Sequence, residues 1–161
     1  MAETVNIDFR SSVPVETKLS NFNPYAFVYD DVECASIEGW IQSLKSEDID
    51  VQLEVCKLAG RTAKRAGRKL PDWREKGVLY WKGKAYDRTS NEYLELVTNA
   101  YQTMANANKE FCDWLVSTGD ATLTHKVGSS VKAETILTEK EFCDILTMIR
   151  NDLHYSDQME F

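Results

Sequence analysis

The sequence predicts an α+β fold, a mostly helical single domain that carries small antiparallel β-hairpins. Apolar residues recur with helical spacing over much of the chain, two short strand pairs flank turn residues, and the length of 161 residues suits one domain. An apolar share of 43% is enough for a sizeable core. Because no repeat or long linker divides the chain, we expect one domain over residues 1–161, with its core at 19–153 and a frayed tail at 154–161.

Three segments have the patterns of β-strands. Residues 4–9 alternate between apolar and polar side chains, which predicts one half-buried strand. Residues 26–34 predict a hairpin that turns at two successive aspartates. Residues 78–86 predict a second hairpin around Lys82 and Gly83.

Helix-start signals divide the first half of the chain into two predicted helices. The first covers residues 36–45, where the Ser36 side chain can cap the first turn. The second starts near Ser46, has acidic residues in its first turn, and ends around Gly60 or Gly67.

The second half of the chain carries further helix signals. Pro71 stops helical structure, and capping boxes at residues 89–92 and 138–141 open a long helix and a last amphipathic helix. Between them, the apolar spacing at residues 111–115 predicts a helix that stops at Gly119.

The composition argues against several classes of partner. A net charge of −7 does not suit a general nucleic-acid coat or an anionic membrane surface, so any nucleic-acid binding would come from a local patch. The N-terminus has no secretory signal pattern, and no stretch approaches the roughly 18 apolar residues of a membrane helix. The four cysteines are dispersed, as in proteins with reduced thiols. We therefore expect a cytoplasmic protein with no membrane partner.

The sequence predicts neither a metal site nor a cofactor. The two histidines, His125 and His154, lack zinc-ligand spacing. The absence of G-x-S-x-G, P-loop and G-x-G-x-x-G motifs argues against serine hydrolases, P-loop kinases and Rossmann enzymes.

A polar face on the helix predicted at residues 36–45 is the most informative pattern in the chain. It aligns Glu38, Gln42 and Lys45 at positions i, i+4 and i+7. A carboxylate, an amide and an amine in line could hold a polar ligand and perform acid, base or nucleophile chemistry. The alternative is that the two charged residues only complement the helix dipole, with Trp40 on the core face.

A group of cations follows on the second predicted helix. Spaced at i, i+4, i+7, i+8 and i+11, they would share one face and could bind a phosphate-bearing ligand. The alternative is a solvated face balanced by the acidic residues at 47–54. The five cations are Lys57, Arg61, Lys64, Arg65 and Arg68.

Aromatic residues and one histidine are further candidates for ligand contacts. Bases stack on tryptophan and tyrosine rings, although such residues more often pack in the core. His125 lies at a predicted strand end before a glycine turn and could hydrogen-bond a ligand, but no neighbouring acid marks it as a general base. The aromatic candidates are Trp40, Trp73, Tyr80, Trp81 and Tyr86.

Several motifs together resemble the N-glycosidase family called NADAR or YbiA-like. Residues 19–22 (Leu-Ser-Asn-Phe), followed by a hairpin and by residues 36–45, are similar to its N-terminal signature, a Ser-Asn-Phe segment before a Glu-x-x-x-Gln-x-x-Lys helix. Residues 65–68 with the Asp-Trp pair at 72–73 look like its Gly-Arg and tryptophan segment. The likeness covers most of residues 19–153, and the chain also resembles small proteins of T4-like phages that look like divergent members.

The resemblance implies a YbiA-like fold and cleavage of the bond between a nitrogen and the C1 of an ADP-ribose or ribose phosphate. By position, Glu38 would be the catalytic carboxylate, and Lys45 would stabilise charge or attack C1 to form a Schiff base. Asn21 and Gln42 would bind ribose hydroxyls. The remaining ligand-binding candidates are Phe22 and Trp40 in the pocket wall, Arg65 and Arg68 at phosphates, and His125.

The preferred function is removal of ADP-ribose from ADP-ribosylated guanine in nucleic acid, by a phage counter-defence enzyme in the host cytoplasm. The alternatives are an N-glycosidase acting on a small phosphorylated nucleotide, and an inactive module that binds ADP-ribose or a host protein. The positions of the side chains distinguish an enzyme from an inactive module. An enzyme requires Glu38 and Lys45 to face one cleft together with Asn21, rather than separate solvent-exposed faces.

Overall fold

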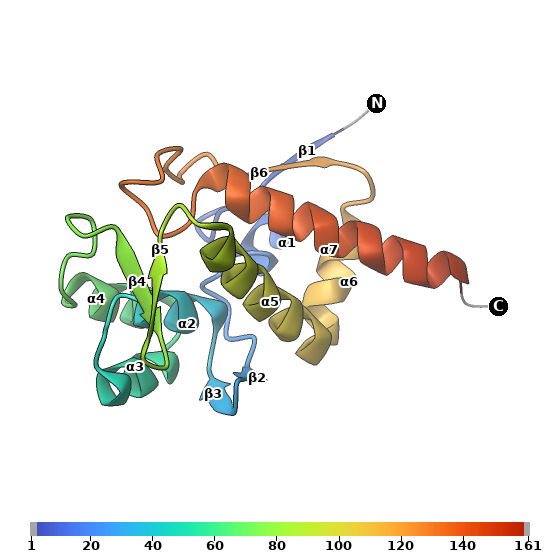
Figure 1. Cartoon of the computed structure of the whole chain (residues 1–161). Coiled ribbons are helices and arrows are strands. Elements are labelled where there is room, and N and C mark those ends of the chain that lie inside the picture. The colour runs from blue at the N-terminus through green and yellow to red at the C-terminus, as the bar shows by residue number, and fades with distance from the viewer. Residues whose placement is uncertain (1–2, 160–161) are drawn as a thin grey trace.

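The computed structural model describes residues 3–159, which contain seven helices and three two-stranded sheets (Figure 1). The predicted α+β class with small antiparallel strand pairs is confirmed. The elements in chain order are β1 (Thr4–Asn6), α1 (Pro14–Lys18), β2 (Phe27–Tyr29), β3 (Val32–Cys34), α2 (Ile37–Ser43), α3 (Ile49–Cys56), α4 (Gly60–Arg68), β4 (Val78–Trp81), β5 (Lys84–Asp87), α5 (Asn91–Ala107), α6 (Lys109–Ser117), β6 (Thr122–Thr124) and α7 (Glu139–Met159).

Two of the sheets are the predicted hairpins. The strands β2 and β3 turn at Asp30 and Asp31, whose φ angles are 48° and 65°. The strands β4 and β5 turn at Lys82 and Gly83, whose φ angles are 50° and 86°. Two successive residues with positive φ form a tight turn whose twist matches that of the flanking antiparallel strands.

The third sheet joins two ends of the fold that are far apart in the sequence. β1 pairs in parallel with β6, so that Thr4 lies opposite Thr122 and Asn6 opposite Thr124. The strand expected at 4–9 is shorter than predicted, and its partner is a segment that no local pattern connects to it. This pairing places the residues that follow both strands side by side.

α2 is the central helix, and each of its residues, 37–43, is buried. It begins where predicted, because the Ser36 hydroxyl accepts a hydrogen bond from the Gly39 N–H at 3.0 Å. It packs against α3, α4 and α5. It ends at Ser43, so the predicted continuation of the helix to Lys45 is wrong.

The single helix predicted from Ser46 to Gly60 or Gly67 is also wrong, because the chain forms two helices there, α3 and α4. Asp48 rather than Ser46 caps α3. Its carboxylate accepts hydrogen bonds from two N–H groups of the first turn, at 2.9 and 3.2 Å.

Contacts with the start of α2 explain the break between α3 and α4. The carbonyl of Cys56, at the end of α3, accepts a hydrogen bond from the Ala35 N–H at 2.9 Å. The carbonyl of Leu58 accepts one from the Ser36 hydroxyl, also at 2.9 Å. These carbonyls are therefore satisfied without a continuing helix, and α4 starts afresh at Gly60, whose φ is 57°.

The later helices start and end close to the predicted residues. Ser90 caps α5, and α6 ends before Gly119, whose φ of 60° suits a helix C-terminus. Thr138 and Glu141 form the predicted capping box of α7, with reciprocal hydrogen bonds of 3.1 and 2.8 Å.

α7 runs further than the sequence suggested. It continues to Met159 through the segment where the sequence predicts a frayed tail from residue 154, and residues 160–161 lie outside the described range. No helix in residues 3–159 is both long and apolar enough to cross a membrane.

Gly39 of α2 lies directly against the segment that follows α3, and this contact leads to a testable prediction. A Cβ there would overlap the Leu58 carbonyl oxygen, a backbone atom that cannot rotate away. A Cβ at Gly67 would instead meet the end of the Gln42 side chain, which can move. We expect Gly39→Ala to lower the free energy of unfolding by about 1–3 kcal/mol and Gly67→Ala to lower it less. Urea unfolding measures both, and equal losses would contradict this account.

Candidate active site

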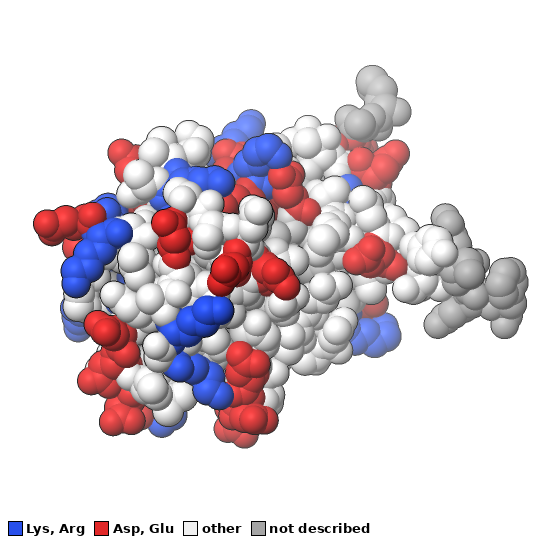
Figure 2. Space-filling view, viewed as in Figure 1, with Lys and Arg blue, Asp and Glu red and all other residues white. Residues whose placement is uncertain are grey.

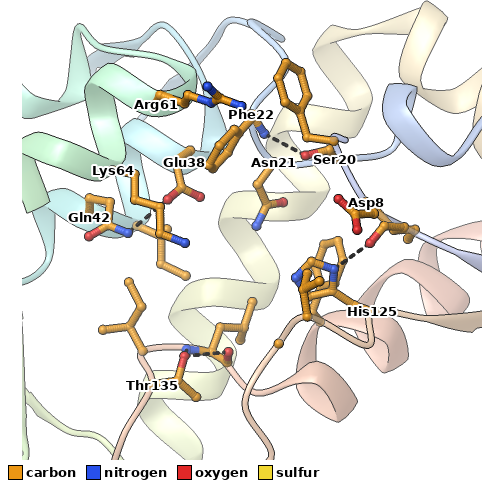
Figure 3. Close-up of a pocket in the computed structure, with 18 of the residues that line it drawn as sticks. Asp8, Ser20, Asn21, Phe22, Glu38, Gln42, Arg61, Lys64, His125 and Thr135 are labelled. Carbon is orange, nitrogen blue, oxygen red and sulfur yellow. Dashed lines mark hydrogen bonds between the residues drawn. The ribbon is translucent and has the colours of Figure 1, made fainter. Parts of the chain in front are cut away.

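A cavity of about 740 Å³ lies between α2, α4, the segment after β1 and the loop from β6 to α7 (Figure 3). Its volume is in the range of cavities that bind nucleotide-sized ligands. The structure brings most of the predicted site residues together here. Those that line the cavity are Asn21, Phe22, Glu38, Gln42, Arg65, Arg68 and His125.

Glu38 reaches the cavity from the first turn of α2 and is only 6% exposed. Its Oε1 accepts a hydrogen bond from Nε2 of Gln42, one turn later, at 2.9 Å. Burial raises the pKa of the Glu38 carboxyl above its usual range, while the Gln42 hydrogen bond and the positive charges of Lys64 and Lys45 oppose this shift. The result is a carboxyl group that keeps its proton to a higher pH than an exposed glutamate does.

Gln42 is held against α4. Its Oε1 is buried and has no hydrogen-bond partner in the described part of the chain. The amide end lies so close to Gly67 that a Cβ at that position would overlap it. Gly67 therefore leaves the space in which Gln42 can turn its Nε2 toward Glu38.

Asn21 is oriented by the opposite helix. The hydroxyl of Tyr101, a fully buried residue of α5, donates a hydrogen bond to the Asn21 Oδ1 at 2.8 Å. Because the oxygen is occupied, the amide nitrogen remains to donate to a ligand, and Figure 3 shows it on the cavity side. Phe22, the next residue, packs at 5.4 Å from the ring of Phe9.

One wall of the cavity is basic. Four exposed cations of α4 line it, and none of them forms an ion pair with a carboxylate among residues 3–156, whose side chains the structure describes. By contrast, acidic and basic side chains are interspersed on the face shown in Figure 2. Unpaired arginines suit phosphate oxygens. The four cations, called the α4 cations below, are Arg61, Lys64, Arg65 and Arg68.

Lys57 does not belong with the α4 cations, although the sequence placed it on the same face. It follows the end of α3 and forms an ion pair with Glu54 at 2.9 Å. The break between α3 and α4 changes the direction of the chain after Lys57, so the predicted five-residue stripe is wrong at this residue.

The wall opposite α2 comes from the segments that follow β1 and β6. His125 follows β6, and its Nδ1 lies 2.6 Å from the carbonyl oxygen of Ile7. Asp8 lines the same wall and pairs with Arg10 at 3.2 Å. Hydrogen bonds with Arg10 hold the pKa of the Asp8 carboxyl below its usual range.

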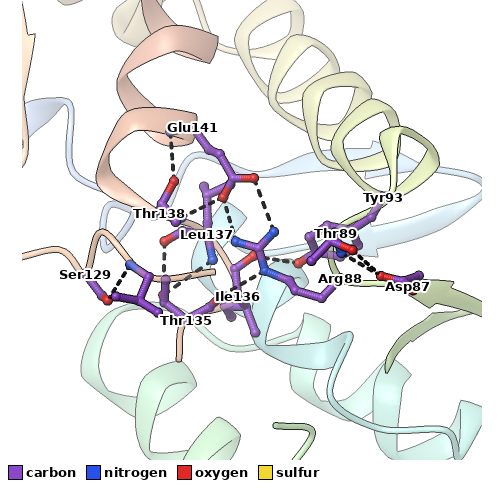
Figure 4. Close-up of polar contacts among 11 residues, drawn as sticks. Asp87, Arg88, Thr89, Tyr93, Ser129, Thr135, Ile136, Leu137, Thr138 and Glu141 are labelled. Carbon is purple, nitrogen blue, oxygen red and sulfur yellow. Dashed lines mark hydrogen bonds and ion pairs between the residues drawn. The ribbon is translucent and has the colours of Figure 1, made fainter. Parts of the chain in front are cut away.

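A buried ion pair holds the loop that closes the cavity (Figure 4). The guanidinium of Arg88 binds both carboxylate oxygens of Glu141, at 2.6 and 3.2 Å, and donates to the Thr135 carbonyl at 2.8 Å. The hydroxyl of Tyr93 donates to the carbonyl of Ile136 at 2.7 Å. Thr135 and Ile136 both line the cavity, so this network sets one of its walls.

Two predicted site residues are not at the cavity wall. Trp40 is fully buried and packs edge-on to Tyr29 and Trp81, with ring centroids 5.7 and 5.8 Å away, so its predicted role in the pocket is wrong and the core alternative holds. Lys45 lies beyond the end of α2, half-buried, and does not line the cavity, so of the three residues expected to face one cleft only Glu38 and Asn21 do so. Burial lowers its pKa, and the charge of Glu38 opposes that shift.

The sequence reasoning missed several residues of the site. The sequence pattern marks Lys64 only as one of several cations, although it lies beside Glu38 in Figure 3. Asp8 and Ile7 carried no signal, because only the parallel pairing of β1 with β6 brings them to His125. A capping box did mark Glu141, but nothing local indicated its ion pair with Arg88.

The arrangement of the fold is that of a known bacterial protein. The NMR structure of the E. coli protein YbiA superposes with a TM-score of 0.65 at 14% sequence identity, and the match covers 100% of this chain and 91% of YbiA. The chain therefore has a YbiA-like fold, as its motifs predicted.

The sequence comparisons give the family. The family model described as bacteriophage protein GP30.3 matches residues 14–151. A protein of Enterobacteria phage T4, described as a 17.1 kDa protein in the Gp30-rIII intergenic region, is 38% identical over 136 residues, which are 84% of this chain and 90% of the relative. The chain belongs to the bacteriophage protein GP30.3 family.

The ion pair behind the cavity loop can be tested by removing one charge. Glu141→Gln keeps the shape of the side chain but leaves the Arg88 guanidinium, 2% exposed, without its counter-charge. We expect the free energy of unfolding to fall by about 3 kcal/mol. Asp144→Asn, which breaks the exposed pair with Lys140, should change stability little. Urea unfolding compares the two, and similar effects would show that burial of the pair does not matter.

The burial of Glu38 predicts a pH-dependent stability. The folded protein keeps the Glu38 proton above its ordinary pKa of 4.5, whereas the unfolded chain releases it, so the free energy of unfolding falls as pH rises from 4.5 through the raised value. Glu38→Gln has no charge to bury and should therefore be more stable than the wild type at pH 8, with the difference disappearing near pH 4. Thermal unfolding across this range measures it. Glu54→Gln, at an exposed site, is the control, and a less stable Glu38→Gln at pH 8 would refute the prediction.

Proposed function

We propose that the protein is an N-glycosidase that releases ADP-ribose from ADP-ribosylated guanine in nucleic acid, as a phage enzyme acting in the host cytoplasm. The observation that carries this proposal is that a buried carboxyl group, Glu38, and the unpaired α4 cations line the same cavity. The YbiA-like fold supports it, and part of each motif that resembles NADAR glycosidases lines this cavity: Asn21 and Phe22, Glu38 and Gln42, and Arg65 and Arg68.

The cavity contains groups that match each part of ADP-ribose. The α4 cations suit its diphosphate, since guanidinium groups donate paired hydrogen bonds to phosphate oxygens. The free amide nitrogen of Asn21 suits a ribose hydroxyl. Gln42 donates to Glu38 and so orients the carboxyl, in addition to any contact with the sugar. Binding energy from the diphosphate would thereby position C1 beside Glu38.

The chemistry follows from the state of Glu38. A carboxyl group with a raised pKa holds a proton that it can donate to the leaving nitrogen as the C1–N bond breaks. It then becomes a carboxylate while C1 acquires oxocarbenium character, so the new negative charge stabilises the new positive one. In this proposal Lys64, which lines the cavity, supplies the amine that the resemblance assigned to Lys45. Lys45 acts only through its charge on Glu38.

One observation favours a second candidate, an N-glycosidase for a small phosphorylated nucleotide. The α4 cations line the cavity itself, where they would also hold the phosphate of a ligand that has no nucleic-acid chain attached. The two candidates share the same catalytic group and differ in whether the ligand continues beyond the cavity.

The experiment is release of free ADP-ribose from an ADP-ribosyl-guanine oligonucleotide. We expect wild type to release it, and Glu38→Gln to lower kcat by about 10²–10⁴-fold with KM little changed, because the acid is lost while the shape is kept. Glu54→Gln, the same chemical change at an exposed site, should retain full activity. The double variant Arg65→Met/Arg68→Met should raise KM.

Each result has a distinct meaning. Release from an ADP-ribosyl-guanosine monophosphate but not from the oligonucleotide would select the small-nucleotide candidate. Binding of ADP-ribose without any release, by a folded protein, would make the chain an inactive binding module and would overturn the proposed enzyme.

A further inference from the structure

His125 is held in one tautomer. A carbonyl oxygen can only accept a hydrogen bond, so the 2.6 Å contact with the Ile7 carbonyl requires the proton to be on Nδ1. In the neutral ring, Nε2 then carries a lone pair and acts as an acceptor. No hydrogen bond engages this nitrogen in the part of the chain whose side chains are described, residues 3–156.

The ring is also held in one orientation. Phe142 of α7 packs against it in a T-shaped arrangement, with the ring centroids 5.3 Å apart. A Cβ at Gly128 would stand 2.8 Å from the His125 Cδ2, so the glycine lets the loop pack closely against the ring. The backbone N–H of His125 donates to the Glu139 Oε1 at 3.0 Å. Figure 3 shows the second ring nitrogen directed into the cavity.

His125 and Glu38 stand on different walls of the same cavity. Glu38 comes from α2 and His125 from the end of β6, and Asn21 lies between them (Figure 3). A sugar carbon held beside Asn21 would therefore have a proton donor on one side and a lone pair on the other. The sequence showed no acid that could orient the histidine, and the structure shows that a backbone carbonyl does so instead.

We infer that His125 is the general base that takes a proton from the water attacking C1, an inference that rests on the proposed glycosidase function. The Glu38 proton passes to the leaving nitrogen, which keeps the electron pair of the breaking C1–N bond. The water oxygen bonds to C1 and its proton passes to Nε2 of His125. The products are ADP-ribose and the unmodified guanine, which remains in its strand, after which the imidazolium loses its proton to solvent and Glu38 regains one.

Charged groups around the ring favour this role. Asp8 lies on the same wall and interacts electrostatically with His125, so its carboxylate is near the positive charge that the ring acquires in the step. Glu139 adds a second negative charge at the backbone of His125. The opposing charges are Arg10, which is paired with Asp8, and Lys64 on the wall of α4.

The test uses two substitutions of His125 and the ADP-ribosyl-guanine oligonucleotide as substrate. His125→Asn keeps an N–H near the position of Nδ1 to donate to the Ile7 carbonyl but removes Nε2. We expect it to lower kcat by about 10²–10⁴-fold with KM within twofold of the wild type. His125→Ala should lose activity similarly and recover part of it in added imidazole, which a merely structural role would not produce.

The outcomes distinguish a failure of the general-base assignment from a failure of the proposed glycosidase function. If wild type is active and His125→Asn retains kcat within threefold, the base assignment is overturned and the glycosidase stands. If His125→Asn does not fold, imidazole rescue of His125→Ala decides, and no rescue overturns the assignment. If wild type and Glu38→Gln are equally inactive, the proposed function fails and the base role fails with it.

Discussion

The contact between Gly39 and the carbonyl of Leu58 is the constraint on which the site depends. It brings the chain after α3 against the central helix, and the carbonyls used there end one helix before the next begins. α4 then crosses α2 with Gly67 against Gln42, which places the α4 cations beside Glu38. A side chain at Gly39 would overlap the Leu58 carbonyl and push α2 away from the chain that leads into α4, whereas one at Gly67 would displace the Gln42 amide.

The site also shows how opposing electrostatic effects are combined. Burying Glu38 is unfavourable for its charged form, and the neighbouring cations reduce that cost without removing it. A carboxyl group in this balance can hold a proton and then release it when positive charge develops nearby. The same cations have no carboxylate partners of their own in the described chain. The phosphates of a bound ligand would supply the negative charge that these cations lack.

Local signals predicted most of the fold, because they depend on neighbouring residues. The cap at Ser36, both hairpin turns and the capping box at Thr138 and Glu141 are of this kind. The break before Gly60 could not be predicted, since it results from hydrogen bonds to the start of α2. The same limit applies to the site: Glu38 and Gln42 share a helix face and were found, whereas the Ile7 partner of His125 depends on a long-range strand pairing.

The parallel pairing of β1 with β6 has a consequence for how the protein is made. The cavity takes one wall from residues 7–10 and another from residues 125–137, so the earlier segment must wait for one that is synthesised much later. Closing so long a stretch of chain is entropically costly and slow compared with forming the local hairpins. The basic wall and Glu38 can form earlier, from residues 36–68. The cavity is therefore completed only once residues 125–137 have been made, so a nascent chain has Glu38 and the α4 cations in place before His125 joins them.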